Sequence, residues 1–68
     1  MNTFGKNLKS IRTSQGLSQF QLAKLIGTTP QRISEWETDK VEPGLTYIIK
    51  IMKALDIGFE ELTDGINK

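Results

Sequence analysis

Apolar side chains recur every three to four residues along this chain, in short segments separated by glycine, proline and polar residues. This period is typical of amphipathic helices, whereas a half-buried strand would alternate every second residue. The expected fold class is all-α, a compact five-helix bundle that forms a single domain over residues 1–68. The pattern predicts these helices, and no strands, at residues 3–15, 18–27, 29–38, 45–55 and 59–63.

Two of the helix starts carry strong local signals. Ser18 and Gln21 fit a capping box, in which the serine hydroxyl accepts from the amide three residues on and the glutamine side chain reaches back. Thr29 followed by Pro30 suits the start of the next helix, because proline lacks an amide hydrogen that would go unpaired there. In the fourth helix, core spacing is shared by Leu45, Ile48, Ile51, Met52 and Leu55.

The composition of the 68 residues limits the chemistry that this chain can perform. The absence of cysteine excludes a disulfide framework and a thiolate metal site, and the absence of histidine removes the commonest general base. The carboxylates of the last helix, Glu60, Glu61 and Asp64, are better explained as charges at a helix start than as catalytic groups. We therefore expect no enzyme, no cofactor, no metal and no small-molecule ligand.

No segment of the sequence suggests a membrane location. Residues 1–7 carry no apolar run of the kind found in secretory signals. Residues 45–52, the most apolar stretch, are interrupted by polar side chains and are too few to span a bilayer. We expect an intracellular, cytoplasmic protein with no membrane partner.

The formal charge is distributed unevenly along the chain. Residues 1–34 contain five basic and no acidic side chains, which gives +5. Residues 35–68 contain four lysines and eight carboxylates, which gives −4, and the two halves add up to the net +1. Such a division favours one half that faces a polyanion, and the alternative is a solvated surface with uneven charges.

One group of residues has a spacing that requires a particular geometry. Ala23 is small enough for another helix to approach closely, and Gly27 can take the left-handed conformation of a sharp turn. Ile33 and Trp36 in the next helix then pack back on the first, on a face that they share with Glu37. This is the requirement for two helices that cross steeply through a short turn, the helix-turn-helix unit.

The motifs around this unit resemble the phage repressor and Cro type of helix-turn-helix protein, also called the XRE family. The resemblance covers about residues 4–63, and it implies a fold of the lambda-repressor type and a bacterial or phage-encoded regulator. The motifs that carry it are Gly16-Leu17-Ser18-Gln19, Leu22-Ala23, Ile26-Gly27-Thr28-Thr29 and Ile33-Ser34-Glu35-Trp36-Glu37.

In this family the third helix lies in the major groove of double-stranded DNA. Steps of about 100° per residue place Gln31 and Glu35 opposite the core face of that helix. Gln31 can pair with adenine, Glu35 can accept from cytosine, and Arg32 can reach guanine or a phosphate. The alternative for each is an ordinary solvated side chain. By family position, Thr29, Gln31, Ser34 and Glu35 match places that touch base edges, and together with Arg32 they are the predicted base contacts.

Other residues are expected to contact phosphates. The amide end of the second helix, at Ser18 and Gln19, offers donors and a positive dipole. In the loop after the third helix, Thr38 and Lys40 are candidates, although Asp39 adds a negative charge where the family often has glycine. By family position, Arg12 pairs with the glutamate at position 37 while it touches the backbone of the DNA, and the alternative is a purely structural ion pair.

One recognition helix reads few base pairs, so the family usually binds two-fold operators as homodimers. Phe59 and Ile66 are the expected dimer contacts. The sequence therefore favours a sequence-specific, dimeric DNA-binding transcriptional regulator, a repressor, that inserts residues 29–38 into the major groove. The alternative is a protein-interaction module with this fold, an antitoxin or adaptor, for which Phe20 and Asp39 argue.

Overall fold

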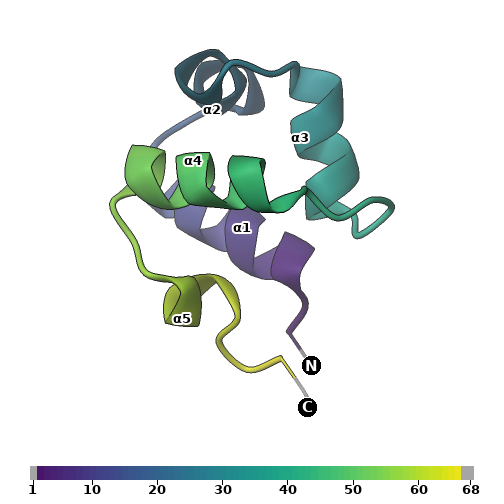
Figure 1. Cartoon of the computed structure of the whole chain (residues 1–68), viewed down its shortest axis with the longest axis vertical. Coiled ribbons are helices and arrows are strands. Elements are labelled where there is room, and N and C mark those ends of the chain that lie inside the picture. Colours follow the sequence, from purple (N-terminus) through teal and green to yellow (C-terminus); the bar gives the residue numbers. More distant parts are fainter. Residues whose placement is uncertain (1, 67–68) are drawn as a thin grey trace.

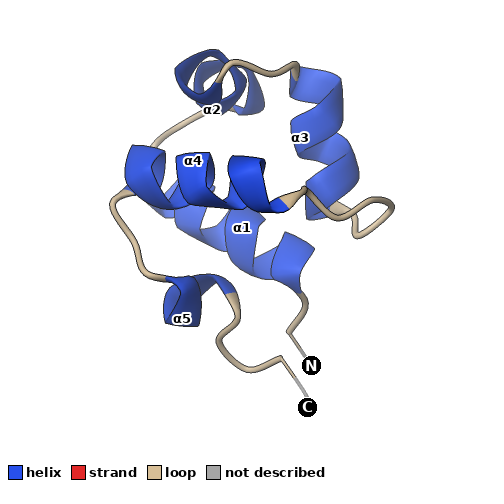
Figure 2. Cartoon of the chain, viewed as in Figure 1, coloured by secondary structure: helices blue, strands red, loops and turns tan. Residues whose placement is uncertain are grey.

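Over residues 2–66, five helices follow one another at the places that the apolar spacing predicts (Figure 1). The computed structural model describes residues 2–66, and within that range the only extended pairing is an isolated bridge between Asn2 and Ile66 (Figure 2). The helices are α1 (Phe4–Ser14), α2 (Gln19–Ile26), α3 (Pro30–Glu37), α4 (Leu45–Leu55) and α5 (Phe59–Leu62). The all-α prediction is thus confirmed.

The caps form as the sequence predicts. The Ser18 hydroxyl accepts from the Gln21 amide at 3.0 Å, and the Gln21 side chain accepts from the Ser18 amide at 2.8 Å. Gly27 ends α2 in the left-handed region, at φ 76°. The Thr29 hydroxyl accepts from the Arg32 amide, so α3 begins at Pro30. These two caps and the glycine fix the turn between α2 and α3.

The core lies where the helices cross. α1 packs against α3 and α5, and α2 packs against α3 and α4. The ring centroids of Trp36 and Tyr47 lie 5.4 Å apart, and Tyr47 packs against the edge of the core. Ala23, Ile33 and Trp36 of the helix-turn-helix unit are buried in this core. Six further core side chains complete the set: Leu8, Leu22, Ile26, Ile51, Leu55 and Leu62.

The prediction that Leu45 belongs to the core is wrong. Its side chain is 72% exposed, while Ile51 and Leu55 on the same helix are buried. Leu45 is the first residue of α4, and helical side chains lean toward the N-terminal end of their helix. The side chain therefore projects past the end of α4 instead of over the core.

Two tertiary contacts hold α1 in place, and the periodicity indicates neither of them. At Gly5 the backbone of α1 comes so close to α3 that a Cβ atom would lie 2.5 Å from the carbonyl oxygens of Trp36 and Glu37. Two residues further along α1, the buried side-chain amide of Asn7 donates to the carbonyls of Leu62 and Asp64, at 2.8 and 2.9 Å. None of the helices between residues 2 and 66 is long and apolar enough to cross a membrane.

Candidate nucleic-acid interface

The helix α3 has one buried and one open face. Ile33, Trp36 and Glu37 point into the molecule and are buried. On the other side Gln31 and Arg32 are exposed, together with the Thr29 cap. Ser34 and Glu35 are partly buried. The five predicted base contacts therefore occupy one outward-facing strip of α3 and its cap.

A side-chain hydrogen bond links the N-terminus of α2 to the C-terminal end of α3. Gln19 Nε2 donates to Glu37 Oε1 at 3.0 Å, so this amide is already held inside the protein. Among the described residues, no group accepts from the backbone amides of Gln19 and Phe20. These two amides, at the positive end of the helix dipole, are the donors that α2 offers to an anion.

A buried ion pair ties α1 to α3, as one interpretation of Arg12 predicts. Arg12 Nε and Nη2 donate to the two carboxylate oxygens of Glu37 at 2.6 and 3.0 Å, and Arg12 Nη1 donates to the Leu17 carbonyl at 2.7 Å. Both residues are only 6% exposed. Such a bidentate ion pair fixes the orientation of α3 relative to α1. A phosphate contact by Arg12 stays a prediction.

The loop after α3 presents Lys40 to solvent. The Lys40 amide donates to the Glu35 carbonyl at 3.0 Å, and this bond folds the loop back on α3. The Thr38 hydroxyl donates to the Ser34 carbonyl at 2.9 Å. A hydroxyl has a single hydrogen, so a Thr38–phosphate bond would require it to rotate away from α3.

The neighbouring Asp39 carboxylate, whose role the sequence leaves open, faces α1. Its Oδ1 accepts from the Gly5 amide at 2.9 Å, and its Oδ2 accepts from the Thr3 hydroxyl. Only the tertiary structure reveals this partner, because 34 residues separate Asp39 from Gly5. The negative charge is therefore directed at the start of α1.

The two predicted dimer contacts lie beside one apolar hollow. Phe59 is 53% exposed and Ile66 is half-buried. The hollow has a volume of about 220 Å³, and both residues line it together with Phe4, Pro43 and Ile48. Leu45 and Ile49, which are also exposed, form a stripe along the adjoining helix α4. The apolar surface around Phe59 and Ile66 is thus larger than the sequence indicates.

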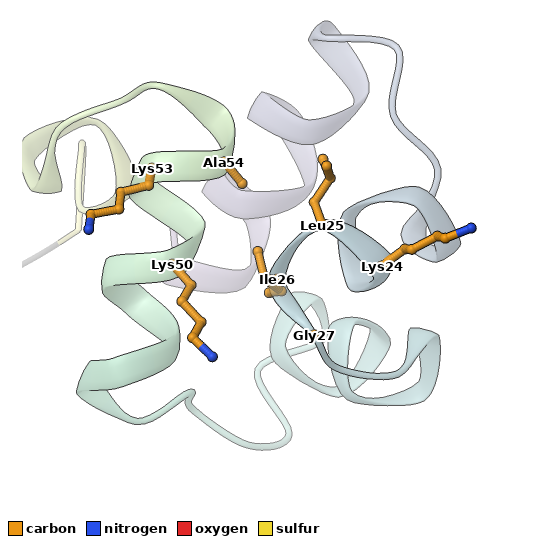
Figure 3. Close-up of a pocket in the computed structure, with 7 residues that line it drawn as sticks. All are labelled: Lys24, Leu25, Ile26, Gly27, Lys50, Lys53 and Ala54. Atoms are coloured by element: carbon orange, nitrogen blue, oxygen red, sulfur yellow. The ribbon is translucent and has the colours of Figure 1, made fainter.

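A second hollow, of about 590 Å³, opens between the end of α2 and α4 (Figure 3). Leu25, Ile26 and Ala54 give it an apolar floor. The Lys24 and Lys53 side chains extend away from it on opposite sides. The Lys50 Nζ lies over the ring of Tyr47, 5.3 Å from the ring centroid. None of the predicted DNA-contact residues lines this hollow.

Comparison with known proteins identifies the family. A helix-turn-helix family model matches residues 8–62. The HTH-type transcriptional regulator PuuR of Escherichia coli is 42% identical over 57 residues, which are 84% of this chain and 31% of PuuR. The SPbeta prophage-derived regulator YonR of Bacillus subtilis is 37% identical over 62 residues, 91% of this chain and 57% of YonR. The chain thus spans between somewhat under a third and somewhat over half of the length of these relatives.

Solved structures agree with the sequence relatives. The P22 c2 repressor, in complex with a synthetic operator, superposes with a TM-score of 0.88 at 26% identity, over 96% of this chain and 98% of that chain. The restriction-modification controller protein C.AhdI from Aeromonas hydrophila gives 0.82 at 39% identity, over 87% and 89% of the two chains. The chain belongs to the helix-turn-helix family of transcriptional regulators, of the XRE type, and it has the lambda-repressor-like fold that its motifs predict.

Proposed function

We propose that residues 1–68 act as one sequence-specific DNA-binding domain that inserts α3 into the major groove. The observation that carries this proposal is the polar strip of α3, which faces outward because the opposite face is fixed by Ile33, Trp36 and the Arg12–Glu37 pair. The similarity to a repressor solved with operator DNA supports the same orientation. The major groove admits a helix and offers a distinct donor and acceptor pattern for each base pair.

Within this orientation, base recognition falls to the exposed side chains of α3. Gln31 offers a donor and an acceptor for adenine, and Arg32 offers a fork of donors for guanine or a phosphate. Glu35 accepts from cytosine and repels phosphate, so it contributes to discrimination more than to affinity. Thr29, in the cap of α3, and Ser34 supply short hydroxyl contacts.

Phosphate contacts would hold α3 at the right depth. The donors available for this role are the backbone amides of Gln19 and Phe20, from which no described group accepts, and the ammonium of the exposed Lys40. Ser18 supports the first of these sites, because its capping box orders the start of α2. Arg12 and Thr38 would contact a phosphate only through side-chain atoms that already form hydrogen bonds within the protein.

A binding selection from random duplex DNA, followed by a salt titration of the winning sequence, tests this function. We expect a two-fold motif and an affinity that falls steeply as salt rises, because phosphate contacts release counterions. The failure to recover any motif, with feeble binding even at low salt, would refute DNA recognition by this chain.

Replacement of Gln31 and of Lys40 by alanine is expected to give two different defects. Gln31→Ala should relax the preference at one base position at a cost of about 1–3 kcal/mol, because it removes a paired base contact. Lys40→Ala should weaken all sequences alike and lower the salt slope by about one. The measurement is binding to a panel of single-base operator variants, and equal profiles for the two proteins would contradict these roles.

We further propose that the chain binds as a homodimer through the surface around Phe59 and Ile66. A two-fold dimer uses the same patch on both subunits, and the hollow beside Phe59 with the Leu45 and Ile49 stripe provides an apolar one. Two α3 helices would then reach successive major grooves on one side of the DNA. Occupation of such an operator is the basis for a repressor role in the cytoplasm.

The dimer can be tested with two phenylalanines of similar exposure. Phe59→Asp should shift the protein from dimer to monomer in sedimentation equilibrium, because a carboxylate would be buried at the interface. Phe20→Asp is the matched control, since Phe20 is 62% exposed but lies on α2. A wild type that is monomeric at all concentrations, or two variants that dissociate equally, would exclude this interface.

A protein-interaction role is the second candidate, and the exposed Phe20 and Leu25 on α2 favour it. The double variant Gln31→Ala and Lys40→Ala separates the two roles. It should abolish operator binding if the chain reads DNA, whereas a protein complex through α2 would persist.

A further inference from the structure

Asp39 has a backbone conformation that costs energy. Its φ is 60°, in the left-handed region, and among the described non-glycine residues only Asp56 shares this feature. Glycine adopts this conformation without a Cβ penalty, whereas aspartate tolerates it at some cost. Interactions of the Asp39 side chain must therefore offset the energy that this left-handed conformation costs.

Those interactions are the two hydrogen bonds with the start of α1. The Gly5 amide belongs to the first turn of α1 and would otherwise lack an acceptor, and it donates to Asp39 Oδ1 at 2.9 Å. The Thr3 hydroxyl donates to Asp39 Oδ2 and accepts from the Lys6 amide at 3.1 Å. Asp39 thus adds a second layer to the cap of α1 from a distant part of the chain.

The same contact determines where the negative charge acts. The first turn of α1 contains no acidic residue of its own. The N-terminal end of a helix carries roughly half a positive charge, so a carboxylate that bonds there is locally compensated. Asp39 can therefore stand beside a phosphate-binding lysine without directing its charge at the DNA.

The contact also fixes the residue that follows. The backbone amide of Lys40 donates a hydrogen bond to the Glu35 carbonyl, and the preceding residue, Asp39, is hydrogen-bonded to α1. The backbone of Lys40 is therefore held on both sides. We propose that Asp39 is a positioning residue that ties the loop after α3 to α1 and so holds Lys40 at a phosphate. This inference rests on the proposed function, in which Lys40 binds the DNA backbone.

Two substitutions distinguish positioning from simple charge. Asp39→Gly keeps the turn but removes both hydrogen bonds, and we expect an operator affinity about fivefold or more weaker. Asp39→Asn keeps an acceptor for the Gly5 amide and loses the charge, and we expect an affinity equal to the wild type or tighter. If charge alone mattered, both variants would bind more tightly than the wild type, and this outcome would overturn the proposal.

A double-mutant cycle tests whether the effect passes through Lys40. In a Lys40→Ala background, Asp39→Gly should change the affinity by less than about twofold, because the contact that it positions is already absent. An undiminished loss in that background would show that Asp39 acts elsewhere.

Amide hydrogen exchange provides a readout that needs no DNA. In Asp39→Gly, exchange at Gly5 should speed up relative to exchange at the buried Ile33, whereas Asp39→Asn should leave that ratio near the wild type. An unchanged ratio in Asp39→Gly would refute the tether itself. A wild type that binds no operator would instead refute the proposed function, and the exchange ratio would still decide whether the tether exists.

Discussion

Replacement of Glu37 by alanine is expected to lower the free energy of unfolding by about 3–5 kcal/mol, because it leaves the buried Arg12 guanidinium without its carboxylate. The two hydrogen bonds from the Arg12 guanidinium to the Glu37 carboxylate measure 2.6 and 3.0 Å, and both residues are nearly inaccessible to solvent. A domain of this size has a total stability of roughly 3–10 kcal/mol. Urea denaturation followed by circular dichroism should therefore show a variant that is partly unfolded even without denaturant.

A milder variant keeps this prediction measurable if the alanine protein does not fold. Glu37→Gln preserves the shape of the side chain and one acceptor for Arg12. We expect its free energy of unfolding to be lower than that of the wild type by about 1–3 kcal/mol, a smaller loss than in the alanine variant. Glu42→Ala, which removes an exposed carboxylate from the loop, serves as the matched control and should change little. Equal urea midpoints for Glu37→Ala and Glu42→Ala would show that the pair does not stabilise the fold.

The loss of Glu37 should also affect DNA binding in the molecules that remain folded. Its carboxylate accepts from Gln19 as well as from Arg12, so three helices meet at this group. Without it the start of α2 is free to move relative to α3. The expected phosphate and base contacts would then no longer be held in one fixed relation.

The parts of this fold that could be predicted are those that depend on neighbours in sequence. The period of three to four fixes the helices, and the caps at Ser18 and Thr29 need only residues within one turn. The outward strip of α3 could also be predicted, because a helix with Ile33 and Trp36 buried has a defined opposite side. The Arg12–Glu37 pair required the family resemblance as well.

The parts that could not be predicted depend on contacts between distant residues. Asp39 meets α1 across 34 residues, and Asn7 meets the Leu62 carbonyl across 55. The side-chain amide of Gln19 donates to the Glu37 carboxylate, 18 residues further along the chain. No local pattern indicates such a bond, because its partner is set by how the helices cross.

Gly5 is the residue at which that crossing is expected to be most sensitive, and Gly5→Ala should destabilise the protein by about 3 kcal/mol. Helix propensity alone predicts the opposite, a gain of up to about 1 kcal/mol, because alanine is the better helix former. The structure favours a loss, since the new methyl group would lie 2.5 Å from the carbonyl oxygens of Trp36 and Glu37. Backbone oxygens cannot rotate aside as a flexible side chain would, so α1 and α3 must move apart.

The sign of the change in stability decides between these two expectations, and urea denaturation measures it. Gly44→Ala is the matched control, because nothing lies within 4 Å of its added methyl group and the residue precedes α4 with φ −69°. We expect that variant to stay within about 1 kcal/mol of the wild type. If Gly5→Ala proved as stable as the wild type, α1 and α3 could not lie as close as described. The Gly5–Asp39 bond and the tether of Lys40 would then be in doubt as well, because both depend on this close approach.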